Sequence, residues 1–200
     1  QDELMAALTG EWRDVGQIET LSIEGQDLRA LSPEQRRQAG VGFIPEDRNG
    51  HAAVPSMRLS ENTLITCHAG NEFVSKGLIH TDKLEAKASE IIAQFDVRVP
   101  EANPLASSLS GGNLQKFVVG REIIKAPKIL IVSQPTWGVD IGAAMIIRRA
   151  LIELAEQGSA IFLISQDLEE IFAISSHISV LHHGALSPKF PIEEMTAEKV

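Results

Sequence analysis

The apolar residues of this chain fall into two patterns that alternate along the sequence. Short, nearly continuous apolar runs occupy 41–45, 128–132 and 160–165, and runs of this length predict strands buried on both faces. The stretches between the later runs carry apolar residues every three or four positions, which is the spacing of an amphipathic helix. Buried strands that alternate with helices are typical of an α/β fold, in which helices cover both faces of a parallel sheet.

Capping residues mark the predicted helix ends. Ser32 and Pro33, followed by Gln35, predict the start of a helix that Gly40 terminates. Further helices are predicted from Thr81, from Gly112 to about 125, over about 142–157, and over 167–174.

Two of these helices have a recognisable apolar side. The helix from Thr81 is expected to bury Leu84, Ala88, Ile91, Ile92 and Phe95. The helix over 142–157 is expected to place Met145, Ile146, Leu151 and Leu154 mostly on one side.

Three other segments have weaker patterns. Residues 17–24 alternate well enough for a half-buried strand, and 25–27 read as the turn after it. Residues 178–183 predict a last strand that ends at Gly184. The tail from 187 is polar and broken by prolines, so we expect a linker or a frayed end there.

The character of the sequence changes between residues 48 and 108. This segment has few β-branched runs, contains loop residues at 70–71 and 100–104, and includes the helix predicted from Thr81. We interpret 48–108 as a mainly helical insertion into an α/β core formed by 1–47 and 109–186, with 187–200 as a tail.

Composition and charge exclude several classes of protein. The 200 residues carry a formal net charge of −9, which argues against a surface that binds nucleic acid through its phosphates. The single cysteine, Cys67, cannot form an internal disulfide. Because His177, His182 and His183 have no second cluster of ligands, we expect no metal centre there.

One helix start carries candidate chemistry. Ser110, Gly111, Gly112 and Asn113 stand at the beginning of the helix that follows the insertion. Free backbone N–H groups and the helix dipole favour an anion at such a position, and glycine allows a phosphate to approach the backbone closely. A capped helix after a flexible loop explains the same residues equally well, so the motif by itself leaves both interpretations open.

The strand that follows this helix ends in an unusual way. The stretch ILIVSQPTWGVD (129–140) has the form of a strand that delivers acidic side chains to a nucleotide site, but Ser133 and Gln134 carry no charge.

The order of these motifs resembles the nucleotide-binding domain of an ATP-binding-cassette (ABC) transporter. The stretches that carry the resemblance are LSGGNLQK, QPTWGVD, ISQDLEE, FDVRVP and GVGFIPEDRNGHAAVPSMRLSENTLI. The match is closest to the second cassette of the double-cassette ATPase subunits in bacterial importers of sugars and purine nucleosides. The resemblance implies a P-loop NTPase cassette fold, with a RecA-like core and a helical subdomain.

The resemblance also assigns roles to residues. Ser110, Gly111 and Gly112, with Asn113 beside them, correspond to the signature motif, which contacts the γ-phosphate of ATP held on the opposite cassette. Asp140 corresponds to the D-loop aspartate. A second set of positions, described next, corresponds to the cassette's own nucleotide site.

Glu46 lies where most cassettes have the glutamine of the Q-loop, although a solvated turn in which Glu46 and Asp47 pair with Arg48 is an alternative. Gln1 would occupy the position of the P-loop lysine. The N-terminal strands and the glycines of the P-loop are therefore expected to be missing from this sequence.

Three substitutions predict that the cassette's own site does not hydrolyse ATP. Ser133 and Gln134 replace the aspartate that anchors Mg²⁺ and the glutamate that polarises water, and Gln166 replaces the switch histidine. Loss of a general base usually costs about 10²–10⁴-fold in rate. ATP and Mg²⁺ are then expected in the site of the partner cassette, with no metal held by this chain.

The resemblance further implies partners and a location. These are a second cassette in the same subunit, transmembrane permease subunits bound through the helical insertion, an extracytoplasmic solute-binding protein acting indirectly, and the cytoplasmic face of the membrane. Trp137, where the family usually has arginine, could pack across the cassette interface or cover the end of the sheet. Two other functions stay open: an active ATPase that binds metal through Glu46, Asp47 or Asp140, and an ABC-type module unconnected with transport.

Overall fold

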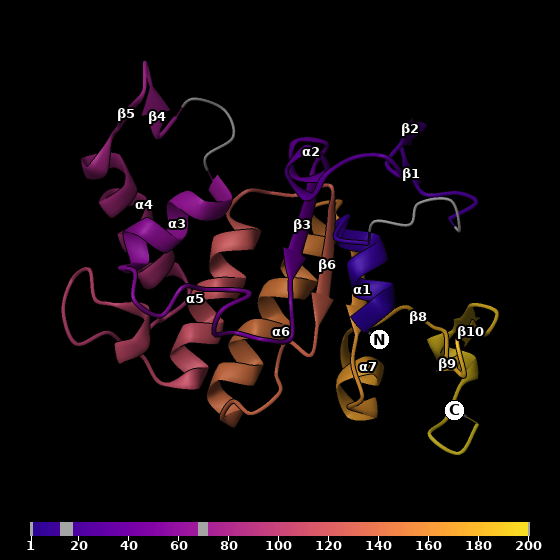
Figure 1. Ribbon diagram of the computed structural model, residues 1–200. Helices are drawn as coiled ribbons and strands as arrows, with labels where there is room; N and C mark the ends of the chain where they lie inside the picture. Colours follow the sequence, from indigo (N-terminus) through magenta and orange to yellow (C-terminus); the bar gives the residue numbers. More distant parts are fainter. Residues whose placement is uncertain (1, 13–17, 68–71, 200) are drawn as a thin grey trace.

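The core of the protein is a three-stranded parallel sheet. The computed structural model describes residues 2–12, 18–67 and 72–199. In the sheet, β6 (Ile129–Ser133) lies between β3 (Val41–Ile44) and β7 (Ala160–Ile164), and all three strands run in the same direction (Figure 1). The three apolar runs of the sequence are thus the three strands of the sheet, as predicted.

Both faces of this sheet are covered at β3 and β6. The prediction of a fully buried strand is wrong for β7, the last strand of the sheet, where Ala160 and Phe162 are exposed and only Ile164 is buried. Leu130 and Val132 of β6 point to one face and join the core formed with α5 (Gly111–Ile123) and α6 (Ile141–Glu156). Ile131, between them, points to the other face and packs in a cluster that includes Met5 and Leu8 of α1 (Asp2–Thr9). This alternation follows from the two-residue period of a strand. The α/β class with a covered parallel sheet is therefore confirmed.

Several helices begin and end close to their predicted limits. In α2 (Pro33–Gln38), the Ser32 hydroxyl accepts the backbone N–H of Gln35, and the Gln35 side chain accepts the N–H of Ser32, which completes a capping box. α7 (Leu168–Ile174) begins after Asp167, whose carboxylate accepts the N–H groups of the first turn. No helix within the described ranges combines the length and the apolar character that crossing a membrane requires.

The segment from 48 to 108 contains two packed helices. They are α3 (Leu59–Cys67) and α4 (Thr81–Gln94), which lie side by side and contact α5 (Figure 1). Between them is a small hairpin of β4 (Val74–Ser75) and β5 (Leu78–Ile79), and a short helix, η2 (Ala106–Ser108), precedes α5. The helix predicted from Thr81 is confirmed, while the subdomain limits at 48 and 108 stay a prediction.

The predicted strand over 17–24 is wrong in extent. Residue 17 lies outside the described residues, and only β1 (Ser22–Ile23) is extended; it pairs with β2 (Gln26–Asp27). Glu24 and Gly25 both have positive φ angles, 49° and 82°, and they reverse the chain inside the segment that the pattern predicted as strand and turn. The turn therefore comes earlier than expected, and Gln26 and Asp27 belong to a strand.

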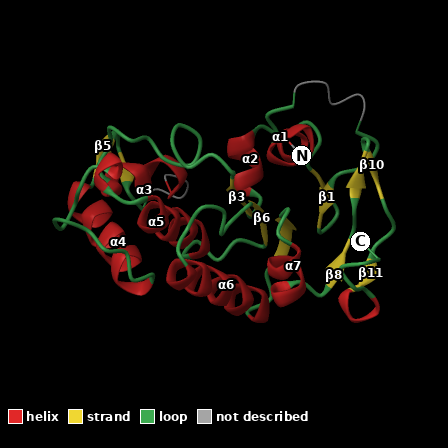
Figure 2. Ribbon diagram, turned by 90° about the horizontal axis from the view of Figure 1, so that it is seen from below, coloured by secondary structure: helices red, strands yellow, loops and turns green. Residues whose placement is uncertain are grey.

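The C-terminal segment also differs from its prediction. The expected strand over 178–183 is divided into β8 (His177–Ile178) and β9 (Leu181–His182), and a turn at His183 and Gly184 leads into β10 (Ala185–Leu186). The tail contains β11 (Phe190–Pro191), which pairs with β8, and the short helix η3 (Ile192–Glu194). A strand at the edge of a sheet tolerates proline, so Pro191 did not prevent β11 from pairing with β8. These strands lie at the end of the molecule opposite α4 (Figures 1 and 2).

The buried side of α6 matches the prediction at Leu151 and Leu154 but not at Met145 and Ile146. Ala143, Ile147, Leu151 and Leu154 face the core, whereas Met145 is 67% exposed and Ile146 is only partly buried. The first two turns of α6 are apolar almost all round, so the sequence could not show which side meets α5.

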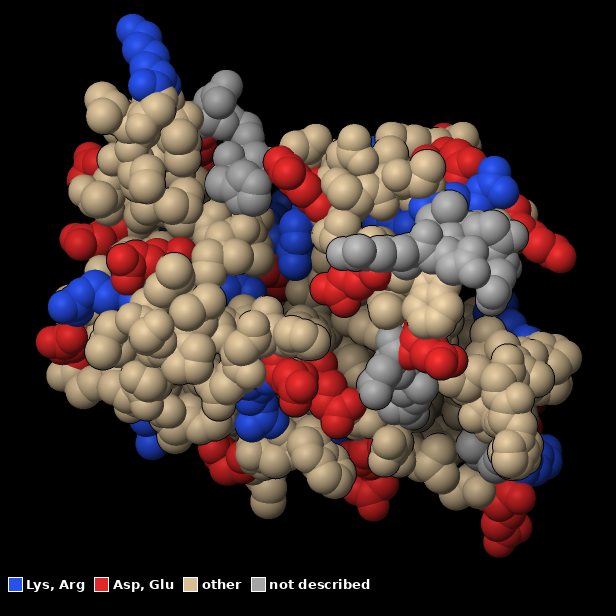
Figure 3. Space-filling model, in the orientation of Figure 1, with Lys and Arg blue, Asp and Glu red and all other residues tan. Residues whose placement is uncertain are grey.

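On the molecular face in Figure 3, basic side chains are interspersed with acidic ones and do not form one continuous patch.

Candidate functional site

The predicted signature motif forms the exposed start of α5. Ser110 is the N-cap, with φ −64° and ψ 155°, and its hydroxyl oxygen accepts the backbone N–H of Asn113 at 3.4 Å and the Asn113 Nδ2 at 2.9 Å. Asn113 also accepts the backbone N–H of Arg98 at 2.9 Å. Ser110 and Gly111 are exposed. The Ser110 hydroxyl and the backbone of Gly111 therefore lie at the exposed, positive end of the helix.

Gly112 allows α5 and α6 to meet closely. A Cβ atom there would lie 3.1 Å from Oδ2 of Asp140 and 3.5 Å from Cβ of Ala143. Asp140 is the N-cap of α6 and accepts the N–H of Ala143 at 2.9 Å, a bond that lowers the pKa of its carboxyl. The predicted signature and D-loop residues are thus brought together at one corner of the molecule.

The positions predicted to replace the catalytic carboxylates and the switch histidine lie together where β6 and β7 end. Ser133 and Gln134 are each 5% exposed. Gln134 has φ 49°, its N–H donates to the carbonyl of Ile164 at 2.8 Å, and its side-chain oxygen accepts the N–H of Gln166 at 3.4 Å. Gln134 therefore links the two strand ends instead of facing an open site.

A buried carboxylate next to these positions was missed by sequence reasoning. Glu170 in α7 is 1% exposed and accepts the hydroxyls of Thr136 at 2.7 Å and Ser165 at 2.8 Å. Its oxygen also lies 3.8 Å from Nε of Arg148. The acidic residues that follow Asp167 were visible in the sequence, but nothing there indicated that the second of them turns inward toward a threonine 34 residues away.

Glu46 and Asp47 are exposed and line a cleft of about 730 Å³, to which Met5, Thr9 and Ser133 also contribute. Asp140 does not line this cleft. The described residues contain no group of three or more His, Cys, Asp or Glu side chains placed to hold a metal ion. The uncharged Ser133 and two solvated carboxylates are a poor fit for Mg²⁺, which prefers several fixed oxygen ligands. Gln1, the predicted position of the P-loop lysine, lies outside the described residues.

Arg48 does not pair with its acidic neighbours, so the ion pair of the predicted alternative is wrong, although Glu46 and Asp47 are exposed as a solvated turn requires. No ion pair joins Arg48 to Glu46 or Asp47, all three of which are described. Instead its Nε donates to Oε1 of Gln115 in α5 at 3.1 Å. The loop after β3 is therefore tied to the signature helix.

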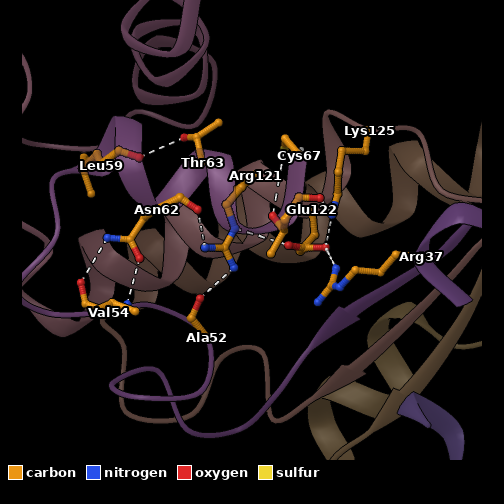
Figure 4. Close-up of polar contacts among 11 residues, drawn as sticks. Arg37, Ala52, Val54, Leu59, Asn62, Thr63, Cys67, Arg121, Glu122 and Lys125 are labelled. Carbon is orange, nitrogen blue, oxygen red and sulfur yellow. Dashed lines mark hydrogen bonds and ion pairs between the residues drawn. The ribbon is translucent and has the colours of Figure 1, made fainter. Parts of the chain in front are cut away.

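The far end of α5 is held by a buried polar network (Figure 4). Arg121 donates to the backbone carbonyls of Asn62 at 3.1 Å and Ala52 at 2.7 Å. Glu122, fully buried, forms ion pairs with Arg37 at 2.8 Å and with Lys125. These contacts attach α5 to α3, to the loop before it and to α2, so the signature helix is fixed at its C-terminal end as well.

Comparison with known proteins gives consistent results. The sequence model of the family described as ABC transporter matches residues 3–137. The guanosine import ATP-binding protein NupO of Bacillus subtilis is 35% identical over 201 residues, covering 100% of this chain and 39% of the relative. The ribose import ATP-binding protein RbsA 1 of Rubrobacter xylanophilus is also 35% identical, covering 99% of this chain and 39% of the relative. The chain thus spans well under half the length of these curated relatives.

Solved structures show the fold. An ATP-binding cassette of an ABC transporter in its ADP conformation aligns with a TM-score of 0.73 at 20% identity, covering 100% of this chain and 77% of the other. A dimeric ATP-binding cassette in a post-hydrolysis state, bound to ADP and phosphate, aligns with a TM-score of 0.69 at 20% identity, covering 85% and 72%. The predicted cassette fold is confirmed.

Proposed function

This chain belongs to the ABC transporter family, and we propose that it is the degenerate nucleotide-binding domain of an importer for nucleosides or simple sugars. In this proposal its own site does not hydrolyse ATP, while its signature motif completes the ATP site of a partner cassette. The observation that carries the proposal is the end of β6, where Ser133 and Gln134 are buried and Gln134 is bonded to Gln166.

The chemistry of these side chains supports a site without hydrolysis. A serine hydroxyl carries no charge to hold a divalent cation, and a glutamine amide cannot accept a proton from water. The side-chain oxygen of Gln134 is already used by the N–H of Gln166. A positioned general base contributes about 10²–10⁴-fold to rate, so its loss is expected to leave turnover near background.

The start of α5 supports a role toward a partner's nucleotide. Ser110 offers a hydroxyl donor, and Gly111 leaves the backbone accessible at the positive end of a 13-residue helix. The bound ATP and its Mg²⁺ would be held by the P-loop and carboxylates of the partner cassette. That partner is proposed to lie in the same subunit, because the relatives named above are much longer than this chain.

The helical segment supports a permease contact. A groove of about 600 Å³ between α3 and α4 is lined by Met57, Leu64, Ile79 and their neighbours, and Leu78 beside it is 70% exposed. Exposed apolar surface of this kind commonly marks a protein–protein contact. We therefore place the permease on residues 48–108 and the domain at the cytoplasmic face of the membrane, with the solute-binding protein acting through the permease.

Substitutions in the signature test the proposal in the intact subunit. Ser110→Arg or Gly111→Asp puts a bulky or negatively charged side chain where the partner's phosphate would lie, and either change should abolish steady-state ATPase activity. Arg29→Met serves as a control, because Arg29 lies beside the β1–β2 hairpin and forms an exposed pair with Asp27. Activity that survives both signature changes would refute the proposal.

A second candidate, an active ATPase with substitute carboxylates, is favoured by one observation: Glu46 and Asp47 line the same cleft as Ser133. Phosphate release by this domain without a partner separates the two functions. Turnover that is clearly above background and disappears in the Glu46→Gln, Asp47→Asn double variant would support the second candidate. A module unconnected with transport is tested by co-purification, because only the importer subunit should be retained by a membrane permease.

A further inference from the structure

Arg48 lies between the signature helix and the turn that follows β6. A Cβ atom on Gly111 would lie 3.0 Å from its Nη1, and a Cβ atom on Gly138 would lie 3.7 Å from its Nη2. Gly138 has φ 62°, in the left-handed region that favours glycine. Two glycines on different elements therefore leave the room that this guanidinium occupies, directly beside the exposed start of α5.

The guanidinium is held in a fixed orientation. Its Nε donates to Oε1 of Gln115 at 3.1 Å, and Nε2 of Gln115 donates to the carbonyl of Pro135 at 2.9 Å. Gln115 is 1% exposed, so the group that holds Arg48 is itself fixed inside the protein. One edge of the guanidinium faces the protein interior through Nε, and the two terminal nitrogens are left to contact other groups.

These terminal nitrogens are not used within the described part of the chain. Neither donates a hydrogen bond there, and no described carboxylate lies within 4.0 Å of the guanidinium. Burial lowers the pKa of Arg48, as it does for Arg36 and Arg121. In those two arginines, however, both terminal nitrogens donate hydrogen bonds to backbone carbonyls. The terminal nitrogens of Arg48 therefore have no acceptor among the described residues and stay open to a ligand from outside.

We propose that Arg48 is a further phosphate-contacting residue, which binds the terminal phosphate of the nucleotide held by the partner cassette together with Ser110 and Gly111. The assignment rests on the proposed function and adds a cation to a motif that otherwise offers neutral donors. A guanidinium with two free, parallel N–H groups matches a phosphate in a bidentate manner. An anion from outside the chain would supply the missing acceptors and the missing negative charge.

The test uses the intact subunit and steady-state ATPase assays that separate KM from kcat, with Mg·ATP varied. Arg48→Met keeps the apolar stem and removes the charge, and it should raise KM for Mg·ATP about tenfold or more, the effect of losing a charged hydrogen bond. Arg48→Lys keeps the charge without the fork, so its KM should fall between those of Arg48→Met and the wild type. Arg48→Met also removes the bond from Nε to Oε1 of the buried Gln115, so its melting temperature should fall by several degrees whether or not Arg48 binds phosphate. KM for Mg·ATP is therefore the deciding measurement, because a purely structural role would leave it unchanged.

The outcomes are distinct. An unchanged KM in a folded Arg48→Met variant overturns the assignment; if that variant does not fold, an unchanged KM for Arg48→Lys does the same. Ser110→Arg is measured in parallel. If Ser110→Arg loses activity while Arg48→Met is unaffected, only the role of Arg48 is refuted. If Ser110→Arg keeps full activity, both the proposed function and the role of Arg48 are refuted. Arg29→Met should leave KM and kcat at wild-type values.

Discussion

Glu122 provides a quantitative test of how the signature helix is held. Its carboxylate has no exposed surface and is surrounded by Arg37, Arg121 and Lys125 (Figure 4). Burial by itself would raise the pKa of Glu122, but the three cations outweigh burial and lower the pKa from 4.5 to about 2. The carboxylate is therefore more stable as an anion in the folded protein than in the unfolded chain.

The difference in the pKa of Glu122 between the folded and unfolded states makes the stability of the protein depend on pH. Because the pKa is lower in the folded state, the ionised carboxylate stabilises the fold above pH 4.5, and the stabilisation is lost as the pH falls toward 2. The full contribution is about 3 kcal/mol at about 1.4 kcal/mol per pKa unit, and about 2 kcal/mol of it should be gone by pH 3. Glu122→Gln should lower the free energy of unfolding at pH 7 by about 3 kcal/mol, since it leaves three cations without their partner.

Urea denaturation of the purified chain between pH 7 and pH 3 measures this effect. The wild type and Glu122→Gln should differ by about 3 kcal/mol at pH 7, and the gap should narrow by about 2 kcal/mol at pH 3. Glu156→Gln, at the exposed end of α6, is the matched control and should change stability by less than about 0.5 kcal/mol at either pH. Parallel pH curves for the wild type and Glu122→Gln would show that the cations do not hold this carboxylate ionised.

Three further predictions concern other parts of the domain. Gly120→Ala should lower the free energy of unfolding by about 1–3 kcal/mol in urea titrations, because the new Cβ would lie 2.5 Å from the ring of Phe95; no destabilisation would show that the ring moves freely. Gln134→Glu should leave phosphate release by this domain at background, since Ser133 still provides no charge for a metal; restored turnover would contradict the account of the site. Trp137→Ala should weaken ATP-dependent association with the separately expressed partner cassette about tenfold or more in calorimetric titrations, yet change stability by less than about 0.5 kcal/mol, because the ring is 65% exposed; unchanged affinity would exclude it from the interface.

The exposure of Trp137 argues against one of the two roles that the sequence left open. If the indole ring covered the end of the sheet, it would be buried against β6 or β7, but most of its surface is exposed. Ile141, the first residue of α6, and Met145, about one turn later, are also exposed, at 82% and 67%. The role of covering the sheet end is therefore wrong, and a role in the cassette interface stays a prediction.

The sequence predicted the sheet because its strands are apolar on both faces, a property that needs no knowledge of distant residues. The cap at Ser32 was predictable for the same reason, since all of its partners lie within three positions. The division of 178–183 into two strands was not, because the turn at His183 and the pairing with Phe190 depend on tertiary contacts. The pattern of neighbouring residues was therefore enough to predict apolar strands and helix caps, but not strands whose ends are set by distant partners.

In the candidate site, too, the residue types could be predicted from the sequence, whereas their contacts could not. Resemblance placed Ser133, Gln134 and Gln166 near one another, but it could not show that Gln134 bonds to the backbone of Gln166. The inward-facing Glu170 and the bond from Arg48 to Gln115 could not be predicted either, because burial and hydrogen bonding between residues 34 or 67 positions apart appear only in three dimensions. The sequence showed that Ser133 and Gln134 carry no charge. The structure adds that both are buried and that Gln134 bonds to Gln166.

The central claim is that the site formed by this domain cannot turn over ATP. The most direct measurement is steady-state phosphate release from Mg·ATP by the intact subunit after the general base of the other cassette has been removed. The account predicts release at background, because no positioned carboxylate remains at Ser133 or Gln134 to bind the metal or accept a proton. Sustained release above background that the Glu46→Gln, Asp47→Asn double variant abolishes would contradict it.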